Sequence, residues 1–193
     1  MTAHPLAVPP GLLRVVAIGS ESTGKTDLTA WLAQALDVPW SSEYARDHAE
    51  ARGGSDALTA ADVDPIARGQ LALEQRAIEE AGARGSHIVL HDTDLLSTLV
   101  YATAYYGEPA VPPWLRDALP MRRPALYLLC DIDVPWHTDS VRDEAADREA
   151  MQRRFVAAVE AIGIPHVRVR GDEGVRRARA LEEIARLGRM PVG

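Results

Sequence analysis

Lysine is almost absent from this sequence of 193 residues. Of its 21 basic residues, 20 are arginine and one is lysine, Lys25. Arginine ends in a wide planar guanidinium, whereas lysine ends in a compact ammonium that fits a narrow anion site. Because arginine is used everywhere else, the pattern indicates that position 25 requires a small positive charge.

Cysteine, long apolar runs and excess positive charge are scarce as well. The one cysteine, Cys130, cannot form an internal disulfide and lies in an apolar run, so we expect a buried, unreactive thiol. No apolar run approaches the roughly 18 residues that a membrane span needs, and the first residues lack the pattern of a secretion signal. The formal net charge of −7 disfavours nucleic acid and anionic membranes as partners. We therefore expect a cytoplasmic protein and leave its oligomeric state open.

Strand patterns alternate with helix patterns after a proline-rich start. Residues 1–12 are expected to form a flexible tail and residues 13–193 a single domain. The pattern predicts strands at 13–18, 38–42, 87–92, 125–130 and 166–170, with the second strand running out into residues 43–47. It predicts helices at 25–36, 59–83, 95–106, 147–162 and 174–187. Such alternation is typical of an α/β fold with a parallel sheet covered by helices on both faces.

A glycine-rich motif lies between the first predicted strand and the first predicted helix. It has the form G-x-x-x-x-G-K-[ST] and consists of Gly19, Ser20, Glu21, Ser22, Thr23, Gly24, Lys25 and Thr26. In such a P-loop, backbone N–H groups and the helix N-terminus bind the phosphates of a nucleotide, and the lysine reaches the β- and γ-phosphates. The hydroxyl of Thr26 would bind Mg²⁺. We therefore predict an ATP site at residues 19–26.

Acidic residues follow two of the predicted strands, where a metal and an acceptor would lie in a P-loop protein. Asp92 ends an apolar strand, and we expect it to hold Mg²⁺ together with Thr26, partly through water. Asp94 either contacts the acceptor or caps the following helix. Glu43 would anchor or deprotonate an acceptor hydroxyl, and Arg46 is a further candidate for binding the substrate. The alternative is that these two residues form a surface ion pair. Which acid acts as the base stays open.

A group of arginines follows the fourth predicted strand. Arg142 and Arg148 flank an acidic stretch, and we expect them to close over the nucleotide as a lid and to stabilise the transferring phosphate. The alternative is that they are exposed on a solvated helix. Tyr44 and Trp136 are candidates for stacking on a substrate ring, although such residues more often pack in a core or at its rim.

Taken in order, these motifs resemble the NadR-type ribosylnicotinamide kinase domain, a P-loop kinase, over about Val15 to Ala180. The resemblance rests on the glycine loop and on the segments Glu43-Tyr44-Ala45-Arg46, Gly69-Gln70, Asp92-Thr93-Asp94 with Thr98, Asp133-Val134-Pro135-Trp136, and Arg142 with Arg148. It implies a three-layer P-loop fold with five parallel strands in the order 2-3-1-4-5 and a mobile lid. It also implies MgATP-dependent phosphorylation of the 5′-hydroxyl of nicotinamide riboside to nicotinamide mononucleotide, a step of NAD salvage.

The sequence departs from this family in several places. Some members carry one ring before the Glu-Tyr pair and another after Gly69-Gln70, where this sequence has Ser42 and Leu71. Full-length NadR proteins carry an N-terminal adenylyltransferase domain, which we expect to be absent because residues 1–12 alone precede the first strand. The alternatives are a P-loop kinase for another nucleoside or small alcohol, and a regulatory ATPase or nucleotide-binding switch. A GTPase is disfavoured, since its Asn-Lys-x-Asp signature requires a second lysine.

Overall fold

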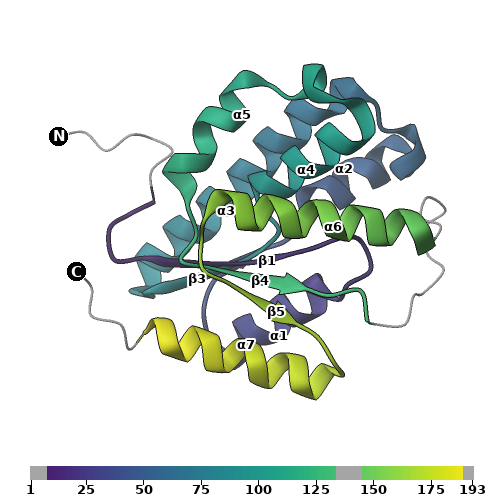
Figure 1. The fold of residues 1–193 in the computed structure, drawn as a ribbon. Coiled ribbons are helices and arrows are strands. Elements are labelled where there is room, and N and C mark those ends of the chain that lie inside the picture. The colour runs from purple at the N-terminus through teal and green to yellow at the C-terminus, as the bar shows by residue number, and fades with distance from the viewer. Residues whose placement is uncertain (1–7, 134–144, 189–193) are drawn as a thin grey trace.

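The fold is a five-stranded parallel sheet with helices on both faces (Figure 1). This computed structural model describes residues 8–133 and 145–188. The strands are β1 (Leu13–Ile18), β2 (Trp40–Ser41), β3 (Ile88–Asp92), β4 (Leu126–Cys130) and β5 (His166–Val169). Their order across the sheet is β2-β3-β1-β4-β5, and each neighbouring pair is parallel, which confirms the expected order.

Helices connect the strands along the chain, and the last helix follows β5. They are α1 (Lys25–Leu36), α2 (Tyr44–Arg52), α3 (Val63–Arg84), α4 (Leu95–Tyr106), α5 (Pro113–Ala118), α6 (Ala145–Ile162) and α7 (Glu173–Leu187). Short 3₁₀ helices occupy Ser55–Ala57, Ala60–Asp62, Glu108–Ala110 and Leu119–Arg122. Among the residues that the structure describes, no helix combines the length and apolar character needed to cross a bilayer.

Alternate side chains of β1 pack on opposite faces of the sheet. Val15 and Ala17 belong to the core beneath α1 and α7, whereas Val16 and Ile18 pack with residues of α4 and α6. All four are buried, as expected for a central strand covered on both faces. Figure 1 shows these two helical layers, with α1 and α7 on one side and α4 and α6 on the other. Since the strands are parallel, their carboxyl ends meet at one edge, where open α/β sheets bind ligands.

Two helices and one strand end differ from the sequence prediction. The expectation that the second strand runs into residues 43–47 is wrong, because α2 begins at Tyr44. This helix has no buried residue and therefore no apolar periodicity to detect. Helix α5 has six residues and begins with Pro113, so it is too short for a periodic pattern. Strand β2 has two residues, and Pro39 before it has no N–H to extend the ladder.

Residues 1–7 of the expected tail lie outside the described residues. Further along, the N–H of Leu12 donates to the carbonyl oxygen of Pro9 at 3.2 Å. The side chain of Leu12 packs against a small cluster formed by Ala77, Ile78, Ala81 and Val89. The division of the chain at residue 12 stays a prediction.

Candidate functional site

The glycine-rich motif connects β1 to α1 and wraps around its own lysine. Lys25 is 7% exposed, and its Nζ donates to the carbonyl oxygen of Ser20 at 2.7 Å. Thr23 Oγ1 donates to the same carbonyl at 2.9 Å. Gly24 leads into α1 with a φ of 74°, and Ser22 has a φ of 52°, a conformation that costs a non-glycine residue energy. Such a loop presents main-chain N–H groups toward an anion.

The neighbouring strand and α6 hold the start of the loop in place. Gln152 of α6 accepts from the N–H of Ser20 at 3.0 Å and donates through Nε2 to the carbonyl oxygen of Cys130 at 2.9 Å. Gly19 lies against the same strand end, and a Cβ there would come within 2.6 Å of that carbonyl oxygen. Gly19 also has a φ of 145°, so any other residue would be strained. Sequence reasoning did not identify Gln152, because a glutamine within a helix carries no distinctive signal.

Thr26 and Asp92 meet beside the loop. Thr26 Oγ1 donates to Asp92 Oδ2 at 2.6 Å, and Asp92 Oδ1 is buried with no hydrogen-bond partner among the described residues. Burial raises the pKa of Asp92 to about 6, and the nearby Lys25 ammonium opposes this shift. An orphaned carboxylate oxygen next to a hydroxyl fits a hard cation such as Mg²⁺. The described residues contain no group of three or more His, Cys, Asp and Glu side chains suited to a metal, so water and phosphate oxygens would complete the coordination.

Arg176 of α7 connects the glycine loop to the segments that follow β4 and β5 at the same edge of the sheet. Its guanidinium donates to the carbonyl oxygens of Thr23 at 2.8 Å, Asp131 at 2.9 Å and Gly171 at 2.9 Å, and it pairs with Asp133. A groove begins beside it at the end of the glycine loop. It is lined by Gly24, Asp27, Leu28, Asp133, Gly171, Asp172, Glu173, Arg176 and Arg177. In the sequence, Arg176 looks like any arginine of an amphipathic helix.

Of the two expected lid arginines, Arg148 lies at the glycine loop. It is 9% exposed and donates through Nη2 to the carbonyl oxygen of Ser22 at 2.8 Å, so the solvated-helix alternative does not hold for it. Its Nε is buried and has no partner in the part of the chain that the structure describes. A buried donor of this kind suits a bound anion. Arg142 and Trp136 lie outside the described residues.

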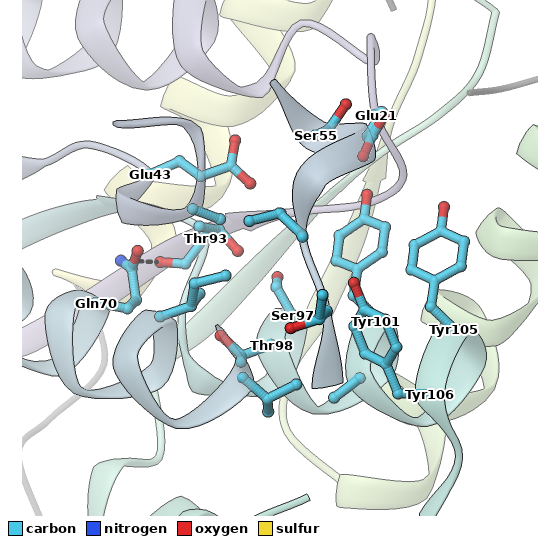
Figure 2. A pocket seen from close by; sticks show the side chains of 16 residues that line it. Glu21, Glu43, Ser55, Gln70, Thr93, Ser97, Thr98, Tyr101, Tyr105 and Tyr106 are labelled. Atoms are coloured by element: carbon cyan, nitrogen blue, oxygen red, sulfur yellow. Dashed lines mark hydrogen bonds between the residues drawn. The ribbon is translucent and has the colours of Figure 1, made fainter. Parts of the chain in front are cut away.

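A pocket opens next to the loop, between α2, α3 and α4 (Figure 2). It is lined by Glu21, Glu43, Ala45, Ser55, Leu58, Thr59, Val63, Ile66, Gln70, Thr93, Ser97, Thr98, Tyr101, Ala102, Tyr105 and Tyr106. Figure 2 shows Glu43 and Thr93 on one side and the three tyrosines of α4 on the other. Sequence reasoning missed these tyrosines, although their place on the helix after Asp92-Thr93-Asp94 was a usable signal.

Glu43 connects this pocket to the glycine loop. It lines the pocket and also an adjoining groove that contains Lys25 and Arg46. The ion pair expected as the alternative is present, with Arg46 Nη2 lying 3.8 Å from Glu43 Oε2. Arg46 is 62% exposed and Glu43 20%, so the pair is loose and solvent-screened. The carboxylate of Glu43 therefore faces the pocket and the adjoining groove as well as the guanidinium of Arg46.

Tyr44 packs on α3 and does not line the pocket. A Cβ at Gly69 would come within 2.1 Å of the Tyr44 ring, so only glycine leaves room for it. The N–H of Tyr44 donates to Gln70 Oε1 at 2.9 Å, and Gln70 Nε2 donates to the carbonyl oxygen of Thr93 at 3.4 Å. The structure thus supports rim packing for Tyr44, and stacking of its ring on a substrate stays a prediction.

Both carboxylate oxygens of Asp94 accept hydrogen bonds from other parts of the fold. Oδ1 accepts from the N–H of Leu96 at 3.0 Å, which caps α4, and Oδ2 accepts from the hydroxyl of Tyr127 at 2.8 Å. Burial raises the pKa of Asp94 to about 6, and the carboxylate of Glu74 adds to the shift. The alternative of a helix cap is therefore realised, and a contact of Asp94 with an acceptor stays a prediction.

The strand order and the glycine loop define a P-loop nucleotide-binding protein. The chain matches the family model described as AAA domain over residues 14–176 and belongs to that family. It is 30% identical over 174 residues to the trifunctional NAD biosynthesis/regulator protein NadR of Escherichia coli K12, a match that covers 88% of this chain and 41% of that protein. The chain therefore spans about two fifths of the length of this curated relative.

Solved structures of a NadR protein have the same fold. The crystal structure of NadR in complex with NR matches with a TM-score of 0.77 and 26% identity, covering 94% of this chain and 51% of that one. The complex of NadR with NAD and AMP-PNP gives the same values. The thymidylate kinase of Ehrlichia chaffeensis matches with a TM-score of 0.62 and 13% identity, covering 91% of this chain and all of that one, and this likeness shows the fold alone.

Proposed function

We propose that this chain is a MgATP-dependent kinase that phosphorylates the 5′-hydroxyl of nicotinamide riboside and yields nicotinamide mononucleotide. The observation that carries this proposal is the place of Glu43, which lines both the pocket between α2, α3 and α4 and the groove that reaches Lys25. A hydroxyl acceptor needs a carboxylate between its binding pocket and the phosphate loop. The similarity to NadR proteins, one of which is solved with NR, supports the choice of acceptor.

Different residues would have different roles in such a transfer. Lys25 would leave the Ser20 carbonyl oxygen and neutralise the β- and γ-phosphates, and Arg148 would add a second positive charge through its buried guanidinium. Glu43 would accept the proton of the 5′-hydroxyl, a role that suits it better than Asp94, whose two oxygens already accept hydrogen bonds. Most of the acceleration would come from positioning and charge.

Thr26 and Asp92 would hold Mg²⁺ through the hydroxyl and the unpartnered carboxylate oxygen. When bound, the cation would neutralise the charge of the phosphate oxygens. The proposal keeps the expected place in NAD salvage and the cytoplasmic location, where ATP is available. It concerns the activity of this chain alone, since the curated relative is longer.

An assay of ADP release with an acceptor panel tests this proposal. The purified chain is incubated with ATP, Mg²⁺ and either nicotinamide riboside, uridine, cytidine, adenosine or ribose, and the product is identified by mass spectrometry. We expect the highest kcat/KM for nicotinamide riboside. A preference for another acceptor would leave a kinase with a different substrate. Slow hydrolysis that no acceptor stimulates would point to a regulatory ATPase.

A further inference from the structure

Arg176 of α7 is 5% exposed, and each of its three guanidinium nitrogens has a partner in the protein. Nε donates to the carbonyl oxygen of Gly171 after β5, Nη1 to that of Thr23 in the glycine loop, and Nη2 to that of Asp131 after β4. Nη2 also pairs with the carboxylate of Asp133, which accepts from the N–H of Gly171 at 2.6 Å. One side chain therefore holds together three segments that are far apart in the sequence and meet at the carboxyl edge of the sheet.

The contact with Thr23 sets the direction of a peptide group in the glycine loop. The C=O and N–H of a trans peptide point in opposite directions, and the described part of the chain contains no cis peptide. Because the Thr23 carbonyl points toward Arg176, the N–H of Gly24 points away from this side chain. Gly24 is the N-cap of α1, and the N–H groups at the start of a helix bind anions. Arg176 thus directs one of the N–H groups that a phosphate would contact.

This peptide group needs a restraint from outside the loop. Gly24 has a φ of 74° and no side chain, so its backbone can rotate more freely than that of other residues. A Cβ at this position would meet no atom within 4 Å, so side-chain packing does not hold Gly24 in place. Rotation of the peptide would turn its N–H away from a phosphate. The hydrogen bond of 2.8 Å from Arg176 to the Thr23 carbonyl opposes that rotation and keeps the donor in place before the ligand arrives.

Arg176 differs in this respect from Arg148, which also donates to a carbonyl oxygen of the loop, that of Ser22. The Nε of Arg148 is buried and has no partner among the described residues, so this side chain retains a donor for a phosphate. The charge of Arg176 is instead compensated by Asp133, and each of its nitrogens is occupied. Arg176 therefore acts on the loop and not on the phosphate itself.

We propose that Arg176 is a positioning residue of the nucleotide site. By holding the Thr23 carbonyl, it keeps the N–H of Gly24 directed at the phosphates without contacting them. The inference rests on the MgATP site of the proposed function and is independent of the acceptor. It adds a residue of the last helix, about 150 positions after the motif, to those on which phosphate binding depends.

Calorimetry with MgATP and with magnesium tripolyphosphate, which has the phosphates but no base or sugar, tests the inference. Arg176→Met keeps an unbranched stem and loses the donors, and its Kd should be about tenfold higher for both ligands. Arg179→Met is the matched control, because Arg179 lies on the same helix, pairs with Glu182 and Glu183, and should leave both Kd values unchanged. A rise for MgATP alone would assign Arg176 to the base or sugar and would overturn the inference, as would an unchanged Kd for both ligands. If the wild-type chain binds neither ligand, the MgATP site of the proposed function fails, and the inference fails with it.

Stoichiometry and kinetics separate positioning from a general loss of structure. A partly unfolded variant would bind with fewer sites per chain at the wild-type Kd, and its kcat would fall at an unchanged KM. A misdirected N–H should instead raise the Kd and the KM for ATP at full stoichiometry and leave the KM for the acceptor unchanged. Reduced stoichiometry with a wild-type Kd in Arg176→Met would therefore overturn the inference.

A second variant covers the case in which Arg176→Met does not fold. Arg176→Lys keeps a positive charge opposite Asp133 and lacks the fork that reaches Thr23 and Asp131 at the same time. We expect a folded protein whose Kd for magnesium tripolyphosphate is about threefold to tenfold higher than that of the wild-type chain. A wild-type Kd in Arg176→Lys would show that charge alone suffices and would overturn the inference.

Discussion

The glycine loop and the acceptor pocket are built in different ways. The loop is one continuous segment, residues 19–26, whose side chains and carbonyl groups bind one another, and whose Ser20 N–H donates to Gln152 of α6. The lining of the pocket comes instead from the glycine loop, α2, α3, α4 and the turns between them. A local segment suffices to recognise the phosphates that all nucleotides share, whereas recognition of one acceptor requires distant segments. Changes in the loop should therefore affect every substrate, and changes in the pocket should affect the acceptor alone.

The largest effect is expected for Lys25→Ala. The variant removes the ammonium that Ser20 now binds, so nothing compact and positive reaches the transferring phosphate. Turnover with any acceptor should fall by about 10³-fold, while circular dichroism and the unfolding temperature show an intact fold. Lys25→Arg should restore little, because the guanidinium fork does not fit the loop. Full activity of the alanine variant would refute the assignment of the site.

Glu43→Gln tests the junction between the loop and the pocket. If this carboxylate accepts the proton of the acceptor, kcat should fall by about 10²-fold. The affinity for MgATP, measured by calorimetry, should stay unchanged, because Glu43 lines the acceptor pocket and Lys25 does not. Asp94→Asn is the comparison variant. A larger loss of kcat there, at equal stability, would move the role of base to Asp94.

Gly69→Ala tests whether the packing of the Tyr44 ring on α3 holds α2, at the edge of the pocket, in place. A Cβ at position 69 would lie 2.1 Å from the ring of Tyr44, so the ring and α2 must move. We expect a loss of about 1–3 kcal/mol in the free energy of unfolding, measured with urea. Gly82→Ala in the same helix is the matched control, since a Cβ there meets nothing within 4 Å. The control should be neutral or slightly stabilising, and equal losses in both would contradict the packing argument.

A smaller effect is expected for Ser97→Ala. The Ser97 hydroxyl is buried and has no partner among the described residues, so the free protein loses no hydrogen bond when it is removed. If it binds the acceptor, KM for the acceptor should rise about fivefold, as expected for one hydrogen bond. KM for ATP should be unchanged in the same assay. A rise in KM for both substrates would assign Ser97 to the fold rather than to the pocket.

The smallest effect is expected at Cys130. Burial raises the pKa of this thiol from 9.0 to about 11, so the folded chain should not react with a thiol reagent at pH 8, whereas the unfolded chain should react at once. Between pH 9 and 11 the unfolded chain releases the thiol proton and the folded chain keeps it. Folding stability should therefore fall as the pH rises through this range. Rapid labelling of the native protein would show that the β4 end opens readily.

The sequence predicted those parts of the molecule in which local pattern and tertiary contact agree. The bounds of β1, α1 and α4 match the expected ranges, because β1 is an apolar run and the two helices have regular apolar spacing and C-caps at Asp37 and Gly107. The glycine loop was found because its G-x-x-x-x-G-K-[ST] spacing is a local pattern of consecutive residues. Burial of Cys130 also followed from its apolar run and is confirmed.

What escaped prediction depends on contacts between distant residues. The polar helix α2 is held by the ring of Tyr44 on Gly69 and by the bond from its N–H to Gln70, which no local pattern reveals. The tyrosines of α4 lie in a largely apolar helix whose Leu95, Leu96 and Val100 belong to the core, so their spacing alone looks like core packing. Arg176 and Gln152 looked like ordinary helix residues because their partners are carbonyl and N–H groups of the main chain.

The single lysine of this sequence also makes the glycine loop separately observable. Reductive methylation with ¹³C-formaldehyde would attach labelled methyl groups to Lys25 and to the terminal amine, and to no other side chain. The NMR spectrum would then contain two labelled resonances, one from Lys25 and one from the terminal amine. Because the ammonium is enclosed by the turn that it supports, its resonance should shift when a triphosphate replaces the Ser20 carbonyl oxygen as its neighbour.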